Sequence, residues 1–240
     1  MTPGAEFNTY ADSVASARVF ALTSANPRLT MPPVLKGHTK EQLPTYPEKF
    51  SRRLQLKLFP LGTSLRFPQN PPFYMVQSNS LTPPTDITEP HLLPASLFHT
   101  HTTAPGIANS PLATWTTLFL TATFKKNASL NPQQDLSKLG LQLHDPLTIW
   151  YALSAQNAKW DFKTEDLRVE TSGQWTRGCI VADRRGRPVK EGVGSLEEEV
   201  VGDTGGWGDS RRGNRVSWCV GSPGTEVFAG ELLDRVFGRV

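Results

Sequence analysis

The alternation of apolar and polar positions predicts several short strands along the chain. Residues 53–59 alternate between the two kinds of side chain, which is typical of a strand with one buried face. Leu29-Thr30-Met31 is another short run, ended by prolines. The predicted strands cover residues 29–31, 53–59, 167–171, 175–183 and 215–220. The third and fourth of these are expected to pair across Ser172-Gly173.

Helical spacing predicts helices between these strands. Residues 13–21 form a short amphipathic pattern with Asp12 as its N-cap. Ser110-Pro111 begins the most convincing helix, because serine is a good N-cap and proline suits the first helical position. Ser222-Pro223 predicts the cap of a final helix that ends near Phe237. An apolar stripe follows Pro111 and is expected to face the core: Leu112, Trp115, Leu118, Phe119 and Ala122.

His144-Asp145-Pro146 precedes the apolar run of residues 147–153 and predicts a further helix N-terminus. Aspartate is favoured as an N-cap and proline at the first helical position. The pattern therefore places an imidazole and a carboxylate side by side at one helix end. Two interpretations stay open at this point: a metal ligand beside a proton donor, or a plain N-cap preceded by an incidental histidine.

Composition and charge narrow the class of protein. The 240 residues are enough for one large domain or two small ones. The net charge of +3 is small, and the basic pairs are scattered without interleaved aromatic residues, so we expect no nucleic-acid partner. No apolar run is long enough to cross a bilayer, and the N-terminus lacks a signal-peptide pattern, so we expect no membrane partner. Cys179 and Cys219 lie in apolar runs and predict buried free thiols, which favours the cytoplasm.

His99 and His101 are candidate metal ligands of a weaker kind. They stand at alternate positions, so on a strand both would point to one face. No third ligand of matching spacing lies nearby. We therefore disfavour a metal site at these histidines.

Four motifs occur in an order that is typical of one enzyme family. They are Ala5-Glu6-Phe7-Asn8 with Asp12, His144-Asp145-Pro146-Leu147, Thr176-Arg177-Gly178 with Asp183, and a tail containing Gly213-Asn214-Arg215-Val216, Phe228-Ala229-Gly230 and Arg235-Val236-Phe237. Each motif alone is weak. Together, over most of the chain, they resemble the inosine-uridine nucleoside hydrolase family of the fungal type.

The resemblance implies an α/β fold with an incomplete doubly wound, mostly parallel sheet and long irregular insertions. Family members hydrolyse the N-glycosidic bond of ribonucleosides to ribose and a free base. They hold a calcium ion at the carboxyl ends of the strands, the usual ligand position in such sheets. The resemblance thus implies a ribonucleoside substrate, a calcium cofactor and a homo-oligomer, since relatives are commonly dimers or tetramers. The preference between purine and pyrimidine bases stays open.

The same resemblance assigns roles to four residues. Asp145 matches a calcium ligand, and a hard cation prefers such oxygen donors. His144 matches the residue placed against the base, where it would act as general acid for the leaving group. Glu6 and Asn8 match residues that hydrogen-bond the ribose hydroxyls. We expect all four to converge around one sugar-sized hollow.

Residues 62–84 form a predicted disordered insert, rich in proline, asparagine and serine. Structureless loops of this length are unusual inside a compact domain. In relatives the preceding strand runs almost directly into an Asp-Ile-Thr segment, here residues 86–88. The insert is therefore a functional loop, a disordered segment or a retained intron, and these three origins stay open.

One departure from the family pattern lowers the expected activity. Family members begin with an Asp-x-Asp-x-Gly-x-Asp-Asp loop that carries most calcium ligands and the aspartate that takes a proton from the attacking water, and no segment here matches it. We expect residues 1–240 to be the C-terminal part of a nucleoside hydrolase-like domain, with Met1 inside a former active-site loop. Calcium binding is then expected to be weak and hydrolysis impaired or absent. The alternatives are a non-catalytic remnant, or an unrelated binding domain whose His-Asp-Pro is only a helix cap.

Overall fold

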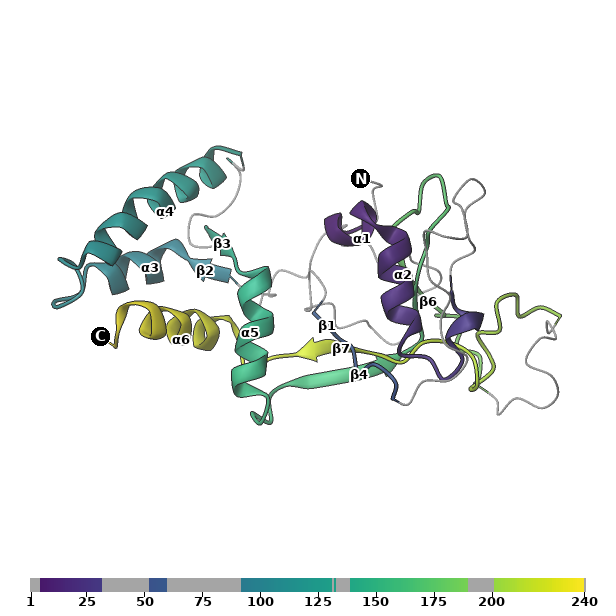
Figure 1. The fold of residues 1–240 in the computed structure, drawn as a ribbon. Coiled ribbons are helices and arrows are strands. Elements are labelled where there is room, and N and C mark those ends of the chain that lie inside the picture. The colour runs from purple at the N-terminus through teal and green to yellow at the C-terminus, as the bar shows by residue number, and fades with distance from the viewer. Residues whose placement is uncertain are drawn as a thin grey trace. The chain divides into compact units, whose positions relative to one another are not determined.

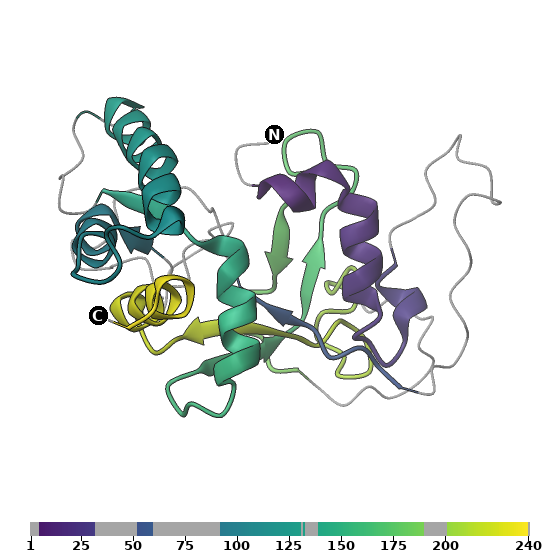
Figure 2. The same ribbon diagram turned by 60° about the vertical axis from the view of Figure 1, so that its left-hand side comes forward.

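The computed structural model describes residues 5–31, 52–59, 92–130, 132, 139–189 and 201–239. It divides into two compact units. The first unit contains the described residues within 1–61 and 162–219, and the second contains those within 84–161 and 220–240. The predicted insert at 62–84 lies outside the described residues. Figures 1 and 2 show the helices and strands from two directions.

The first unit combines short helices with short strands. Its helices are α1 (Phe7–Ala11), α2 (Ser13–Ala21) and the 3-10 helix η1 (Pro27–Leu29). Its strands are β1 (Lys57–Leu58), β4 (Asp161–Glu165), β5 (Leu167–Val169), β6 (Ile180–Ala182) and β7 (Val216–Gly221). The first residue of β4 and the last two of β7 belong to the second unit.

Helix α2 forms where the sequence predicts it. The Asp12 carboxylate accepts a hydrogen bond from the backbone N–H of Ala15 at 2.8 Å, which confirms the predicted N-cap. Ala17 and Phe20 lie on the buried side of the helix. They join a core cluster whose other members are Leu167, Val169 and Val216. Burial of this one face holds α2 against the strands.

The described strands form three small sheets. Strands β1, β7 and β4 lie side by side in that order, and β1 runs parallel to β7. Strands β5 and β6 pair in an antiparallel way, as the sequence predicts, with Leu167 opposite Ala182. A third sheet, in the second unit, is also an antiparallel pair. The mixture of helices and sheets fits an α/β family, whereas the doubly wound, mostly parallel sheet stays a prediction.

Three predicted strands differ from the structure. Of residues 175–183 only β6 is a strand, because a turn occupies residues 174–178. The strand predicted at residues 29–31 is wrong, because η1 begins at Pro27, whose fixed φ suits the start of a helix. Of residues 53–59 only β1 is a strand. The backbone before β1 still contacts the end of α2, since the N–H of Leu54 donates to the carbonyl of Leu22 at 3.1 Å.

The second unit is mainly helical. Its strands β2 (Leu92–Pro94) and β3 (Gly140–Gln142) form the antiparallel pair. Its helices are α3 (Ala95–Thr102), α4 (Pro111–Leu130), α5 (His144–Ser154) and α6 (Thr225–Phe237). Helix α6 contacts α3 and β2, and α3 contacts α4. No helix in the described part of the chain combines the length and the apolar content that crossing a membrane requires.

Helix α4 begins at Ser110-Pro111 as predicted, but it buries the opposite face. The hydroxyl of Ser110 accepts a hydrogen bond from the N–H of Ala113 at 3.0 Å. The side chains of the predicted core stripe are exposed: Leu112, Trp115, Leu118, Phe119 and Ala122. The side chains that are buried instead are Ala113, Leu120 and Phe124. Both faces of α4 are apolar, so packing against α3, and not the pattern, selects the buried face.

The remaining helix starts also correct the sequence predictions. Helix α6 has Gly224 as its N-cap, with φ +115° and no side-chain cap, so the predicted cap at Ser222-Pro223 is wrong. Glycine adopts this φ at little cost, which explains why the helix starts after it. Helix α5 has Leu143 as its N-cap, so Asp145 lies inside the first turn and not at the cap.

The two histidines at 99 and 101 lie on α3 and not on a strand. The Nε2–H of His101 donates to the carbonyl of Gly238 at 2.9 Å. The ring of His99 packs edge-on against Phe98 and Phe124. Residues two positions apart on a helix do not share a face, so the strand geometry for a metal pair is absent. Cys179 and Cys219 are buried, as predicted.

Candidate functional site

Glu6 and Asn8 lie together at the start of α1. The Oε2 atom of Glu6 accepts hydrogen bonds from the backbone N–H groups of Asn8 at 2.9 Å and Thr9 at 3.1 Å. The hydroxyl of Thr9 donates to the Glu6 carbonyl at 3.0 Å. Glutamate is not among the preferred N-cap residues, so the sequence pattern gave no cap signal here.

Glu6 and Asn8 each keep polar side-chain atoms that make no hydrogen bond within the described part of the chain. The second carboxylate oxygen of Glu6, Oε1, makes no hydrogen bond with any residue that the structure describes, nor does the side-chain amide of Asn8. Glu6 is half-buried and Asn8 is exposed. A carboxylate accepts at both oxygens, and an amide both donates and accepts. The start of α1 thus presents the groups that a hydroxyl-bearing ligand requires.

His144 and Asp145 are the first two residues of α5. The Nε2 atom of His144 lies 2.9 Å from Oε1 of Gln142. An amide oxygen only accepts, so Nε2 carries the proton in this hydrogen bond. Asp145 is exposed, and its carboxylate in the first turn is favoured by the helix dipole. Gln142 was not predicted; its signal in the sequence is its place at the end of a strand, two residues before His144.

The second turn of α5 anchors the helix. Leu147 and Trp150 are buried. The Trp150 ring stacks on Phe228 of α6 with 4.6 Å between ring centroids. Its Nε1–H donates to Oε2 of Glu231, also on α6, at 2.8 Å. These contacts fix the helix whose first turn carries His144.

The structure thus brings Glu6 together with Asn8 and His144 together with Asp145. The first pair belongs to the first unit and the second pair to the second unit. The predicted convergence of all four on one hollow therefore stays a prediction.

The described residues do not assemble a metal site. Within residues 5–31, 52–59, 92–130, 139–189 and 201–239, no three His, Cys, Asp or Glu side chains are grouped to hold a metal ion. Calcium takes six to eight oxygen ligands, as a rule. Asp145 contributes one carboxylate, which by itself does not fit such an ion.

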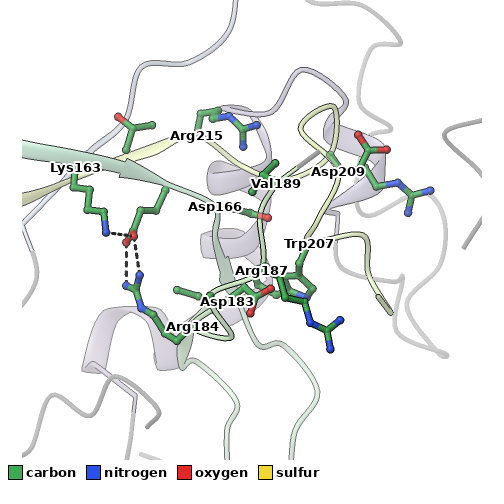
Figure 3. Close-up of a pocket in the computed structure, with 14 residues that line it drawn as sticks. Lys163, Asp166, Asp183, Arg184, Arg187, Val189, Trp207, Asp209 and Arg215 are labelled. Carbon is green, nitrogen blue, oxygen red and sulfur yellow. Dashed lines mark hydrogen bonds and ion pairs between the residues drawn. The ribbon is translucent and has the colours of Figure 1, made fainter. Parts of the chain in front are cut away.

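A hollow of about 330 Å³ in the first unit is lined by charged side chains (Figure 3). Each of its carboxylates pairs with an arginine: Glu165 with Arg184, Asp166 with Arg168, Asp183 with Arg185, and Asp209 with Arg211. None of the four predicted site residues lines it. The sequence analysis missed this hollow because its charges come from segments that are far apart along the chain.

The carboxylates Glu165 and Asp183 in this hollow are kept ionised by neighbouring cations. Burial raises the pKa of Glu165, but hydrogen bonds and charges from Arg184 and Lys163 outweigh burial and lower that pKa overall. A hydrogen bond from Arg185 lowers the pKa of Asp183. Carboxylates held ionised in this way are poor proton acceptors near neutral pH. Glu165 and Asp183 are therefore unsuited to act as a general base at neutral pH.

Comparison with known families accounts for the motifs at the two helix starts. The chain matches the family described as inosine-uridine preferring nucleoside hydrolase over residues 1–208 of 240. This range includes Glu6, Asn8, His144 and Asp145. The chain belongs to this family, which confirms the resemblance found in its motifs. No curated protein matches it.

Proposed function

We propose that this chain binds ribonucleosides and that its site residues serve hydrolysis of the N-glycosidic bond. The reaction breaks the bond between C1′ of ribose and a base nitrogen, adds the oxygen of water to C1′ and leaves a proton on the base. Family membership supports the reaction class. The observation that carries the proposal is the pair of open polar groups on Glu6 and Asn8.

In this proposal Glu6 and Asn8 hold the ribose hydroxyls. The Oε1 atom of Glu6 accepts from one hydroxyl, while its Oε2 stays committed to the cap of α1. The amide of Asn8 donates to and accepts from the neighbouring hydroxyl. Fixing the sugar in this way lowers the entropy cost of reaching the oxocarbenium-like transition state.

His144 acts on the leaving base. An imidazole can give up a proton near neutral pH, and a departing base is a better leaving group when it receives one. The hydrogen bond from Nε2 to Gln142 orients the ring, so the proton that the base receives comes from Nδ1 of the protonated imidazole. Gln142 is thereby a positioning residue for the general acid.

The family implies a calcium ion that would bind the ribose hydroxyls and the attacking water. Asp145 is the one residue here that matches a ligand, and the described residues include no metal-binding group. These residues by themselves do not fit calcium, which takes six to eight oxygen ligands as a rule. We infer that these 240 residues bind nucleosides but hydrolyse them slowly. They contain no match to the aspartate loop that supplies the general base in the family, and a general base typically contributes a factor of about 10²–10⁴.

The test is release of ribose from inosine and uridine by the purified chain, with calcium added. We expect bound nucleoside with turnover far below the roughly 1–10³ s⁻¹ that is usual for enzymes. His144→Ala should release ribose more slowly than the wild-type chain, and release that this variant leaves unchanged would contradict the role of His144 as general acid. Turnover at an ordinary enzyme rate would contradict the inferred impairment. Absence of both binding and release would favour the non-catalytic remnant.

Two further features belong to the same proposal. Family resemblance favours a homo-oligomer, which sedimentation of the purified chain would test. Two buried cysteines that form no disulfide favour a reducing compartment and hence the cytoplasm.

A further inference from the structure

Helix α1, which carries Asn8 and is capped by Glu6, cannot hold its own conformation. It has five residues, and none of them is buried. An isolated helix needs roughly 12–15 residues to be even marginally stable in water. The geometry of Glu6 and Asn8 must therefore be set by neighbouring parts of the first unit.

The backbone of Gly178 lies directly against this segment. A Cβ atom added at Gly178 would lie 2.7 Å from Cα of Tyr10 and 3.1 Å from Cβ of Ala5. The φ of Gly178 is +86°, which residues other than glycine rarely adopt. Glycine thus lets the loop between β5 and β6 touch both ends of the segment 5–10, and the two ribbon views show this loop beside α1 (Figures 1 and 2).

Arg177 makes a second contact from the same loop. Its guanidinium carbon lies 4.1 Å from the centroid of the Tyr10 ring. This distance is within the range of a cation–π interaction. Tyr10 is two residues beyond Asn8, so the contact fixes the second half of α1.

Hydrogen bonds hold the loop itself in shape. The Oε1 atom of Glu170 accepts from the N–H groups of Ser172 at 2.9 Å and Gly173 at 3.2 Å. The N–H of Gly178 donates to the Glu170 carbonyl at 2.7 Å, and the N–H of Arg177 donates to the Gly173 carbonyl at 3.0 Å. The loop is therefore an ordered support for α1.

We propose that Arg177 and Gly178 are positioning residues that hold Glu6 and Asn8 in the geometry required to bind the ribose hydroxyls. This inference rests on the proposed function. The two residues act through Tyr10 and Ala5.

The test compares Arg177→Leu with Arg177→Lys in the full chain, by amide hydrogen exchange and by calorimetric titration. Arg177→Leu should speed exchange of the capped amides of Asn8 and Thr9 and should weaken inosine binding roughly tenfold. Binding of 2′,3′-dideoxyinosine should change little, because it lacks the hydroxyls that the segment holds. Arg177→Lys keeps a cation over the ring, so its amide exchange and its inosine binding should stay close to those of the wild-type chain.

Arg185→Leu is the matched control. It removes an arginine that pairs with Asp183 and Asp203 beyond β6. Among the described residues this arginine makes no hydrogen bond or ion pair with α1, so exchange at Asn8 and inosine binding should not change. Unaltered exchange at Asn8 and Thr9 in Arg177→Leu, or equal weakening for both nucleosides, would overturn the inference. If Arg177→Leu fails to fold, Tyr10→Leu compared with Tyr10→Phe gives the same test, because only Tyr10→Phe keeps a ring for Arg177 to contact.

The two proposals can fail separately. A wild-type chain that does not bind inosine contradicts the proposed function, and the positioning role falls with it. A wild-type chain that binds inosine, beside an Arg177→Leu variant that binds equally well, contradicts only the positioning role.

Discussion

The two helix starts that carry the candidate residues are held in different ways. Helix α5 buries Leu147 and Trp150 one and two turns beyond His144, so its own apolar face anchors it. Helix α1 buries no residue, and its start depends on a glutamate cap and on a loop that is distant in sequence. A local pattern can thus secure one half of a site, while the other half requires support from elsewhere in the chain.

The largest expected effect follows from removing the anchor of α5. Trp150→Ala should lower the free energy of unfolding by about 3–5 kcal/mol, because the indole is buried, stacks on Phe228 and donates to Glu231. Urea unfolding followed by circular dichroism measures this loss. Trp115→Ala is the control; that side chain is 64% exposed, and its removal should cost less than about 0.5 kcal/mol. Equal losses in the two variants would contradict the proposed anchor.

A smaller effect is expected where α1 meets its support. Gly178→Ala should lower the free energy of unfolding by about 1–3 kcal/mol, because alanine is strained at φ +86° and its Cβ would press on Tyr10. Gly230→Ala within α6 should instead raise the free energy of unfolding by roughly 0.5–1 kcal/mol, since no neighbouring group in the described part of the chain lies within 4 Å of the added Cβ. Unfolding curves of both variants check the contrast, and a stabilising Gly178→Ala would refute the close contact.

The smallest expected effect concerns pH. The backbone N–H of Ser172 lowers the pKa of Glu170 below 4.5, with burial opposing the shift. A lowered pKa means that the carboxylate stabilises the fold above about pH 4.5 and that this contribution disappears as the pH falls through the lowered value. The stability difference between wild type and Glu170→Gln should therefore be largest near neutral pH, at roughly 1 kcal/mol, and should shrink as the pH falls below 4.5. A difference that does not vary with pH would contradict this account of the loop.

Local signals in the sequence predicted a good part of the fold. Asp12 and Ser110 act as the N-caps that their residue types suggest. The antiparallel pairing of β5 with β6 also follows from their patterns. In each case the partners lie close together along the chain, so the pattern contains the information.

Features that depend on distant partners could not be predicted in the same way. The buried face of α4 is selected by α3, because both of its faces are apolar. Gly178 meets Tyr10 across most of the chain, and neither residue type signals the contact. The motifs found Glu6, Asn8, His144 and Asp145. They also contain Arg177 and Gly178, but the contact of these two residues with Tyr10 required the structure.

The central claim is that Asn8 and His144 both contact a bound nucleoside. Calorimetric titration of inosine into the wild-type chain, Asn8→Ala and His144→Ala tests it most directly, because the two variants each change a candidate residue of a different unit. The account predicts that wild type binds and that each variant binds roughly three- to tenfold more weakly, as for loss of one hydrogen bond. Asn109→Ala, at another exposed asparagine, should bind like wild type. A wild-type chain that does not bind inosine, or variants at Asn8 and His144 that bind as tightly as wild type, would contradict it.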